Sequence, residues 1–173
     1  MKNRTLLIVA TGIISMLVAC MSPEQKSLER LKKMEIAVSK DTAKNPDKAK
    51  IHDLMMGYKN FADSFPKNDS IPEYLFRAGK LASGLNYTMD ALHCYKQVYE
   101  KFPTSKRAPF SLFMIGFIYE NQIRHPELAK KTYEEFMAKF PTHELAKDVK
   151  FSLDHLGKSD EELIKEFEAK QKI

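Results

Sequence analysis

The sequence contains few of the residues from which catalytic and metal sites are built. It has two cysteines and five histidines among 173 residues, and the histidines are scattered along the chain. Neither a His-Glu-x-x-His zinc motif nor a Gly-x-Ser-x-Gly nucleophile motif occurs, and no second cysteine is placed to complete a metal site. We therefore expect no metal, no cofactor and no enzymatic activity.

One segment is similar to the end of a phosphate-binding loop but lacks two of its required residues. The segment is Arg77-Ala-Gly79-Lys80. Tyr74 stands where the loop needs its first glycine, and Leu81 stands where a serine or threonine must follow the lysine. The match is a coincidence of composition, and we expect no small-molecule substrate.

Glycine is also scarce, and nothing in the pattern of apolar residues predicts a strand. The chain has six glycines, and apolar residues do not alternate with polar ones as they do in a half-buried strand. They recur instead at helical spacing, as in residues 145–156. Three helix starts carry capping boxes, which begin at Ser22, Ser70 and Ser159. The sequence predicts an all-α fold of about eight helices.

The first residues have the composition of an export signal. Lys2 and Arg4 precede an apolar stretch, from Leu6 to Val18, that contains no charge. This stretch is too short to cross a hydrocarbon core of about 30 Å as a stable helix, but it suits the core of a signal peptide. It ends in Leu17-Val18-Ala19-Cys20. An ordinary signal peptide that happens to contain a cysteine is one interpretation of this ending.

The ending also resembles the lipobox of bacterial lipoproteins, and this is the interpretation we favour. The resemblance implies removal of residues 1–19, attachment of diacylglycerol and a fatty acid such as palmitate at Cys20, and a short tether over residues 20–22. Several acyl chains hold a protein stably on a membrane. Cys94 is then the sole remaining cysteine, and a lone cysteine on an apolar helical face is usually a small buried residue.

Processing at Cys20 also lowers the net charge. The whole chain carries 28 basic and 23 acidic residues, a net charge of +5. The loss of Lys2 and Arg4 reduces this to +3 (5 − 2), and the remaining charges of both signs are mixed along the chain. No basic stripe is evident, so we expect no nucleic-acid partner.

A repeat is the second informative feature. Segments that begin with tyrosine and end with Phe-Pro recur at residues 58–66, 95–103 and 133–141, so that the spacing of successive copies is nearly constant. A fixed period in this range is typical of stacked helical hairpins. Proline cannot continue a helix, so each segment should end a helix in the same way.

The last two copies also align without a gap in their first halves, where residues 74–81 lie over residues 112–119. Small residues then coincide with small ones, and tyrosines with tyrosines. This pattern resembles the tetratricopeptide repeat, which implies a helical-hairpin solenoid. The repeat-core positions implied by the resemblance are Tyr58, Ala78, Ala91, Tyr95, Gly116, Ala129 and Tyr133.

The longer period and the Phe-Pro-Thr closings are most similar to two periplasmic families. One is the lipoprotein of the outer-membrane β-barrel assembly machinery, and the other is the Tol-Pal-associated coordinator. The expected layout places tetratricopeptide-like repeats over 23–157 and an amphipathic helix with Leu163, Ile164 and Phe167 over 158–173. The parts within the repeats are a degenerate copy over 23–66, copies over 70–103 and 108–141, and a capping helix over 142–157.

The resemblance also implies a partner groove along the first helix of each hairpin. Its candidate residues are Leu75, Gly79, Phe110, Phe113, Phe117, Glu120 and Asn121. Two interpretations of the three phenylalanines compete: a groove that binds an extended peptide or helix, or a helix buried on all sides beneath a terminal helix. The buried interpretation is favoured because Leu163, Ile164 and Phe167 also need an apolar surface.

These features together predict a membrane-anchored scaffold for protein–protein interactions in a bacterial envelope assembly, for example in outer-membrane protein biogenesis. The expected partners are other envelope proteins. Met21 rather than aspartate follows Cys20. By resemblance to lipoproteins, this favours the periplasmic face of the outer membrane over the inner membrane. The alternatives are a coordinator of cell-wall synthesis or envelope constriction, or an accessory subunit of an envelope enzyme or secretion complex.

Overall fold

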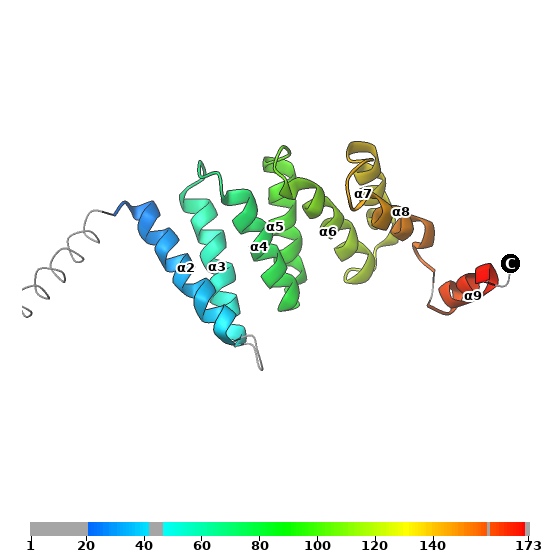
Figure 1. The fold of residues 1–173 in the computed structure, drawn as a ribbon, viewed down its shortest axis with the longest axis horizontal. Helices are drawn as coiled ribbons and strands as arrows, with labels where there is room; N and C mark the ends of the chain where they lie inside the picture. The colour runs from blue at the N-terminus through cyan, green and yellow to red at the C-terminus, as the bar shows by residue number, and fades with distance from the viewer. Residues whose placement is uncertain (1–20, 42–46, 159, 172–173) are drawn as a thin grey trace, which may run out of the picture. The chain divides into compact units, whose positions relative to one another are not determined.

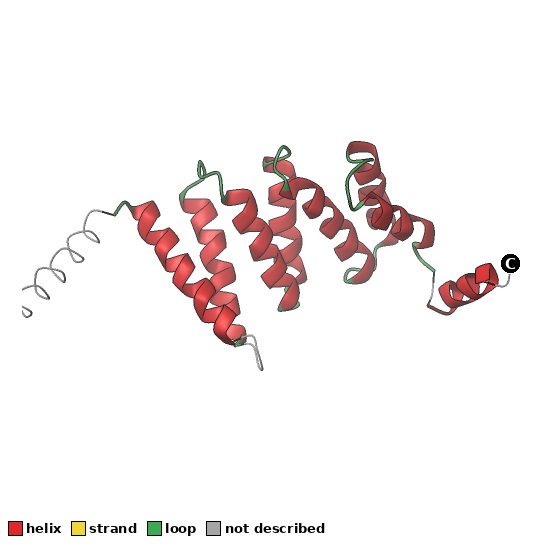
Figure 2. Ribbon diagram, in the orientation of Figure 1, coloured by secondary structure: helices red, strands yellow, loops and turns green. Residues whose placement is uncertain are grey.

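Every regular element is a helix in residues 21–41, 47–158 and 160–171, which the computed structural model describes (Figure 1). No strand occurs in these ranges (Figure 2). The predicted signal segment and Cys20 lie outside them. The helices are α2 (Pro23–Asp41), α3 (Lys48–Ser64), α4 (Ile71–Gly84), α5 (Thr88–Lys101), α6 (Arg107–Asn121), α7 (Pro126–Lys139), α8 (Ala146–His155) and α9 (Asp160–Gln171). The all-α prediction of about eight helices is confirmed.

Consecutive helices pack as hairpins. The hairpins are α2 with α3, α4 with α5, and α6 with α7. Helix α6 also packs against α5, and α8 packs against α7. Helices α4 and α6, the first helices of successive hairpins, contact each other directly. This is the packing that a solenoid of helical hairpins requires.

The Phe-Pro motif ends three helices with the same backbone geometry. Phe65, Phe102 and Phe140 follow α3, α5 and α7, with φ between −130° and −131° and ψ between 49° and 58°. Each phenylalanine N–H still donates a hydrogen bond to the carbonyl four residues earlier. The following proline prevents another helical turn. The repeat in the sequence is therefore a repeat in the structure.

The chain divides into two compact units, one up to Lys67 and one from Asn68 onward. The first unit contains the hairpin of α2 and α3. Ser22 and Gln25 form the predicted capping box, with reciprocal hydrogen bonds of 2.9 and 3.1 Å. A Cβ atom at Gly57 would lie 2.9 Å from Leu31 Cδ2. Gly57, on the second helix, thus provides the close approach that the small residues of the first helix provide in the later hairpins.

The second unit repeats one tyrosine contact in two hairpins. A Cβ atom at Gly79 on α4 would lie 2.7 Å from Tyr95 Cε1 on α5, and a Cβ atom at Gly116 on α6 would lie closer still to Tyr133 on α7. Both tyrosines are fully buried. Small side chains let each pair of helices approach closely, and fully buried examples include Ala78, Ala91, Cys94 and Ala129.

This contact corrects the sequence alignment of the two hairpins. Gly116 is equivalent to Gly79, not to Ala78. Equivalent residues of α4 and α6 are therefore one residue closer in the sequence than the alignment implied. The first turns agree, because the Ile71 N–H bonds to the Asn68 carbonyl just as the Ala108 N–H bonds to the Ser105 carbonyl. The second helices, α5 and α7, are separated in the sequence by the same number of residues as Tyr95 and Tyr133. One residue is therefore inserted in the loop 122–125.

A second correction concerns the start of α4. The capping box expected at Ser70 is absent, because the Ser70 side chain makes no capping hydrogen bond. Glu73, the other member of the expected box, instead pairs with Arg107 and Arg77. A carboxylate that has two guanidinium partners gains more from them than from one backbone N–H.

Candidate interaction surface

The corrected register changes which residues of α4 can reach a partner. Leu75 and Gly79, both expected in a groove, are buried, and Leu75 is only 3% exposed. The Gly79–Tyr95 contact shows that this side of α4 faces α5. Leu75 and Gly79 are therefore core residues. The α4 residues equivalent to Phe113 and Phe117 in the corrected register are Phe76 and Lys80.

The phenylalanines of α6 differ in exposure, so neither sequence interpretation describes them all. Phe113 is half-buried, packs on the core around α6 and α7, and has its ring 6.3 Å from that of Tyr133. Phe117 is 39% exposed, and its ring lies 6.4 Å from that of Phe113. Phe113 is thus partly a core residue, whereas Phe117 is available at the surface.

Helix α8 continues this arrangement with two residues that the sequence analysis did not single out. The Ala146 N–H bonds to the His143 carbonyl as the Ala108 N–H bonds to the Ser105 carbonyl. This shared turn makes α6 and α8 equivalent helices, with Ala146 in the place of Ala108. Phe151 and His155 therefore correspond to Phe113 and Phe117. We call Phe113, Phe117, Phe151 and His155 together the aromatic face.

The rings on α8 are close together and accessible. Phe151 is 49% exposed, and its ring lies 4.2 Å from that of His155. Helices α6 and α8 share one hydrophobic cluster, which includes Phe113, Val149 and Leu153. Phe151 and His155 could have been found from the sequence, because they follow Phe113 and Phe117 by the same number of residues that separates Tyr95 from Tyr133.

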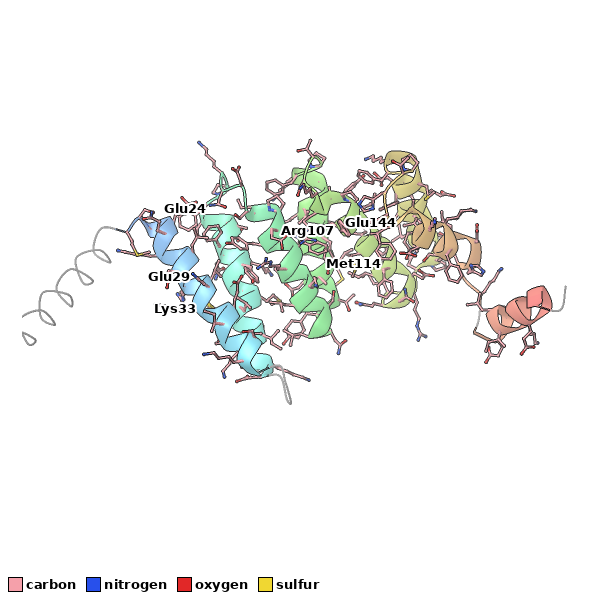
Figure 3. The ribbon with its side chains drawn as sticks, in the orientation of Figure 1. Glu24, Glu29, Lys33, Arg107, Met114 and Glu144 are labelled. Carbon is pink, nitrogen blue, oxygen red and sulfur yellow. The ribbon has the colours of Figure 1, made fainter. Side chains whose placement is uncertain are left out.

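The start of α6 is held against α4 by a charged and aromatic cluster. Arg107, labelled in Figure 3, pairs with Glu73, and its guanidinium carbon lies 4.8 Å from the centre of the Phe76 ring. The hydrogen bond from Arg107 holds the pKa of Glu73 below its usual value. Phe110, a predicted groove residue, is half-buried, with its ring 6.3 Å from that of Phe76 and 5.0 Å from that of His143.

This cluster borders an open cleft of about 470 Å³. Both charge signs line it, since Asp69, Glu73, Lys106 and Arg107 all contribute. Because Glu73 and Arg107 neutralise each other and Phe76 lies beneath the guanidinium, the cluster mainly fixes α6 against α4. It therefore helps to position α6, which carries Phe113 and Phe117.

Acidic residues in the later part of the first helices bind the buried tyrosines. The Tyr133 hydroxyl donates a 2.7 Å hydrogen bond to Glu120, and the Tyr58 hydroxyl donates a 2.6 Å bond to Glu35. Burial, together with Glu120, raises the pKa of Tyr133. Glu120, predicted as a groove residue, is therefore engaged with the core. Asn121 is exposed, and its amide donates to the carbonyl one turn earlier.

The middle hairpin lacks this carboxylate. Ser83 occupies the position of Glu120, and the hydroxyls of both Ser83 and Tyr95 are buried without a well-formed hydrogen bond in the described structure. Burial raises the pKa of Tyr95 to about 12, and the nearby Ser83 hydroxyl offsets only part of that rise. An unsatisfied buried hydroxyl costs roughly 1–3 kcal/mol, so the Tyr95 hydroxyl destabilises this hairpin locally, whereas the equivalent Tyr133 hydroxyl is bonded to Glu120.

We predict that Ser83→Glu raises the free energy of unfolding by about 1 kcal/mol, because the new carboxylate accepts the Tyr95 hydrogen bond. Glu120→Ser is the reciprocal variant and should lower it by a similar amount. Thermal and urea melts followed by circular dichroism measure both. A Ser83→Glu protein that melts below the wild type would contradict the assigned equivalence of Ser83 and Glu120.

A comparison with known families finds a match to one part of the chain. Residues 110–143 match the family described as tetratricopeptide repeat. This segment is similar to a tetratricopeptide repeat. It comprises most of α6, all of α7 and the turn that follows, and α4 with α5 reproduces its tyrosine contact. No curated protein matches the chain.

Tetratricopeptide repeats stack into surfaces that bind other proteins, so these repeats support a scaffold for protein–protein interactions. Such a fold is typically non-catalytic. In the described ranges, no three His, Cys, Asp or Glu side chains are grouped to hold a metal ion. Within the same ranges, no helix is both long and apolar enough to cross a membrane.

Proposed function

We propose that the chain is a lipid-anchored scaffold on the periplasmic side of a bacterial outer membrane, where its aromatic face holds another envelope protein. The observation that carries the proposal is the exposure of Phe117 and Phe151, at 39% and 49%, on equivalent first helices of one repeat array. Exposed large apolar side chains at equivalent positions of successive first helices support an interaction site on this side of the array.

The form of the aromatic face favours a peptide segment or a helix as the partner. Phe113 is partly fixed by the Tyr133 ring, and Phe151 stacks near His155, so the anchors are held in place before a partner arrives. Anchors that are already ordered lose little conformational entropy on binding. Phenylalanine is also among the residues enriched in protein–protein interfaces.

The membrane anchor is supported by the sequence alone, because residues 1–20 lie outside the described structure. Leu17-Val18-Ala19-Cys20 closes an uncharged stretch that follows Lys2 and Arg4. Met21 follows the cysteine, and by resemblance to lipoproteins this favours the outer membrane. Three chains on one cysteine would give a stable attachment.

Lipidation is tested by metabolic labelling with an alkyne fatty acid. We expect wild-type protein to carry the label and to sediment with outer membranes, whereas Cys20→Ser should lose the label and keep its signal segment. Cys94→Ser is the matched control, since it removes the other cysteine and should retain the label. Label retained by Cys20→Ser would refute the lipoprotein assignment but would leave the repeat scaffold intact.

A further inference from the structure

Helix α2 carries most of its cations on the side that faces away from α3. Residues three, four or seven apart lie on one side of a helix, and this spacing joins Lys26, Arg30, Lys33 and Lys40. All four are exposed. The opposite side of α2 packs on α3 through the buried Leu31. We call Lys26, Arg30, Lys33 and Lys40 together the basic face.

The acids of α2 offset few of these charges. Glu35 accepts the hydrogen bond from Tyr58 on α3, and Glu24 lies in the first turn, where the helix dipole favours an acid. Glu29 lies beside the basic face (Figure 3), but its pair with Lys33 is 4.0 Å long and joins two exposed side chains. Such a pair is weak. The basic face with Glu29 therefore has a net charge of +3 (4 − 1), although the two signs are mixed in the sequence.

The basic face is accessible to a ligand. In the described part of the chain, neither Lys26 nor Arg30 forms an ion pair. These two cations, together with Met21, Glu29 and Lys33, line an open cleft of about 420 Å³. Ile36 lies on the same side of α2 and is 45% exposed. A helix side that combines several cations with accessible apolar residues is suited to the surface of an anionic membrane.

The position of the basic face in the chain agrees with such a ligand. Met21, which lines the cleft, is joined by one peptide bond to the proposed lipid anchor at Cys20. Attraction between a cation and anionic lipid falls off within a Debye length of about 8 Å. At about 1.5 Å per residue, Lys33 would be about 18 Å from Met21 if α2 stood upright on the membrane. The cations therefore favour α2 lying along the membrane, where all of them reach the lipid.

We propose that the basic face binds the headgroups of anionic phospholipids, so that α2 lies along the membrane with its outward side against the lipid. Ile36 then enters the boundary between the headgroups and the acyl chains. The position of α2 directly beside a lipid anchor rests on the proposed function, whereas the binding of headgroups by the basic face does not.

The absence of tryptophan from the sequence provides a fluorescent test. Ile36→Trp in the full-length Cys20→Ser chain places a single tryptophan beside the basic face of a protein without attached lipid. Vesicles of equal parts phosphatidylcholine and phosphatidylglycerol should shift its emission to the blue, and lipids with brominated acyl chains should quench it. Vesicles of phosphatidylcholine alone should do neither. Leu128→Trp is the matched position, since Leu128 is 36% exposed on α7, and its emission should not respond to either vesicle.

Charge variants of the same chain test the cations themselves. Lys26→Gln with Arg30→Gln and Lys33→Gln should weaken binding to the anionic vesicles by about tenfold or more. The matched control removes three exposed lysines of α7 and α8 and should change binding by less than about twofold; its substitutions are Lys130→Gln, Lys131→Gln and Lys147→Gln.

Equal responses of the tryptophan at position 36 to the two kinds of vesicle would overturn the proposal, as would an equal loss of binding in the two charge variants. Full inhibition by inorganic phosphate at matched ionic strength would also overturn it, since the ligand would then be a free phosphate. Failure of the lipoprotein assignment would leave these results unchanged, because the protein in the test carries serine in place of Cys20.

Discussion

Replacing Ala129 with arginine is expected to unfold the repeat formed by α6 and α7. Ala129 is fully buried in the cluster that also contains Leu112, Tyr133 and Phe136. An arginine there must displace packed neighbours and bury a guanidinium for which the cluster offers no acid. Overpacking and an unpaired buried charge together cost several kcal/mol, about 3–5 or more. The total free energy of unfolding of a small domain is only about 5–15 kcal/mol.

The neighbouring residue provides the control. Leu128 is 36% exposed on the same helix, so Leu128→Arg should change stability by less than about 1 kcal/mol. Circular dichroism melts should show Ala129→Arg with a broad or absent transition and Leu128→Arg close to the wild type. Equal melting temperatures for the two variants would count against the packing of α6 and α7 described above.

The second large effect expected is on partner binding, and it should separate Phe117 from Phe113. Phe117→Ser should abolish co-purification of the partner while changing the free energy of unfolding by less than about 1 kcal/mol, because the side chain is largely a surface anchor. Phe113→Ser should lower stability by about 2–3 kcal/mol, because it removes a ring that packs on Tyr133 and the core.

These expectations are checked on the same preparations by urea melts and by affinity purification from solubilised membranes. Leu128→Ser is the matched variant for binding, because Leu128 is about as exposed as Phe117 but lies on the second helix of the repeat. A large stability loss for Phe117→Ser would make it a core residue. Partner recovery unchanged from the wild type would show that it is no anchor.

The hairpin architecture could be predicted from the sequence because the same signal recurs in the middle and at the end of each second helix. The tyrosine and the Phe-Pro ending recur together, and the three phenylalanines adopt the same backbone angles. Local steric rules determine such an ending without help from distant residues. Ala91, Ala129, Tyr95 and Tyr133 were predictable for the same reason, since they lie at a constant distance from it.

The register of the first helices could not be predicted in this way. A one-residue insertion in the loop 122–125 leaves the helix pattern unchanged, and either Ala78 or Gly79 could match Gly116 in size. The distinction depends on which of them lies against the Tyr95 ring, which is a tertiary contact. The error moved the expected groove onto buried residues of α4.

Two further features of the site arise from contacts between distant residues. The sequence pattern places Glu73 in a capping box, but its carboxylate pairs with Arg107 on another helix. The first helix of the first hairpin lacks the small-residue signature because Gly57, on the second helix, provides the close approach instead. In each case a partner from another helix decides what the residue does.

Site-specific photo-crosslinking in living cells would show directly whether a partner lies on the aromatic face. A photoreactive phenylalanine analogue is placed at position 117 on the aromatic face, or at position 128 on the second helix of the same repeat. We expect position 117 to yield a discrete adduct with an envelope protein and position 128 to yield none. An adduct at position 128 with none at 117 would contradict the proposal, because the partner would then contact the second helices instead of the aromatic face.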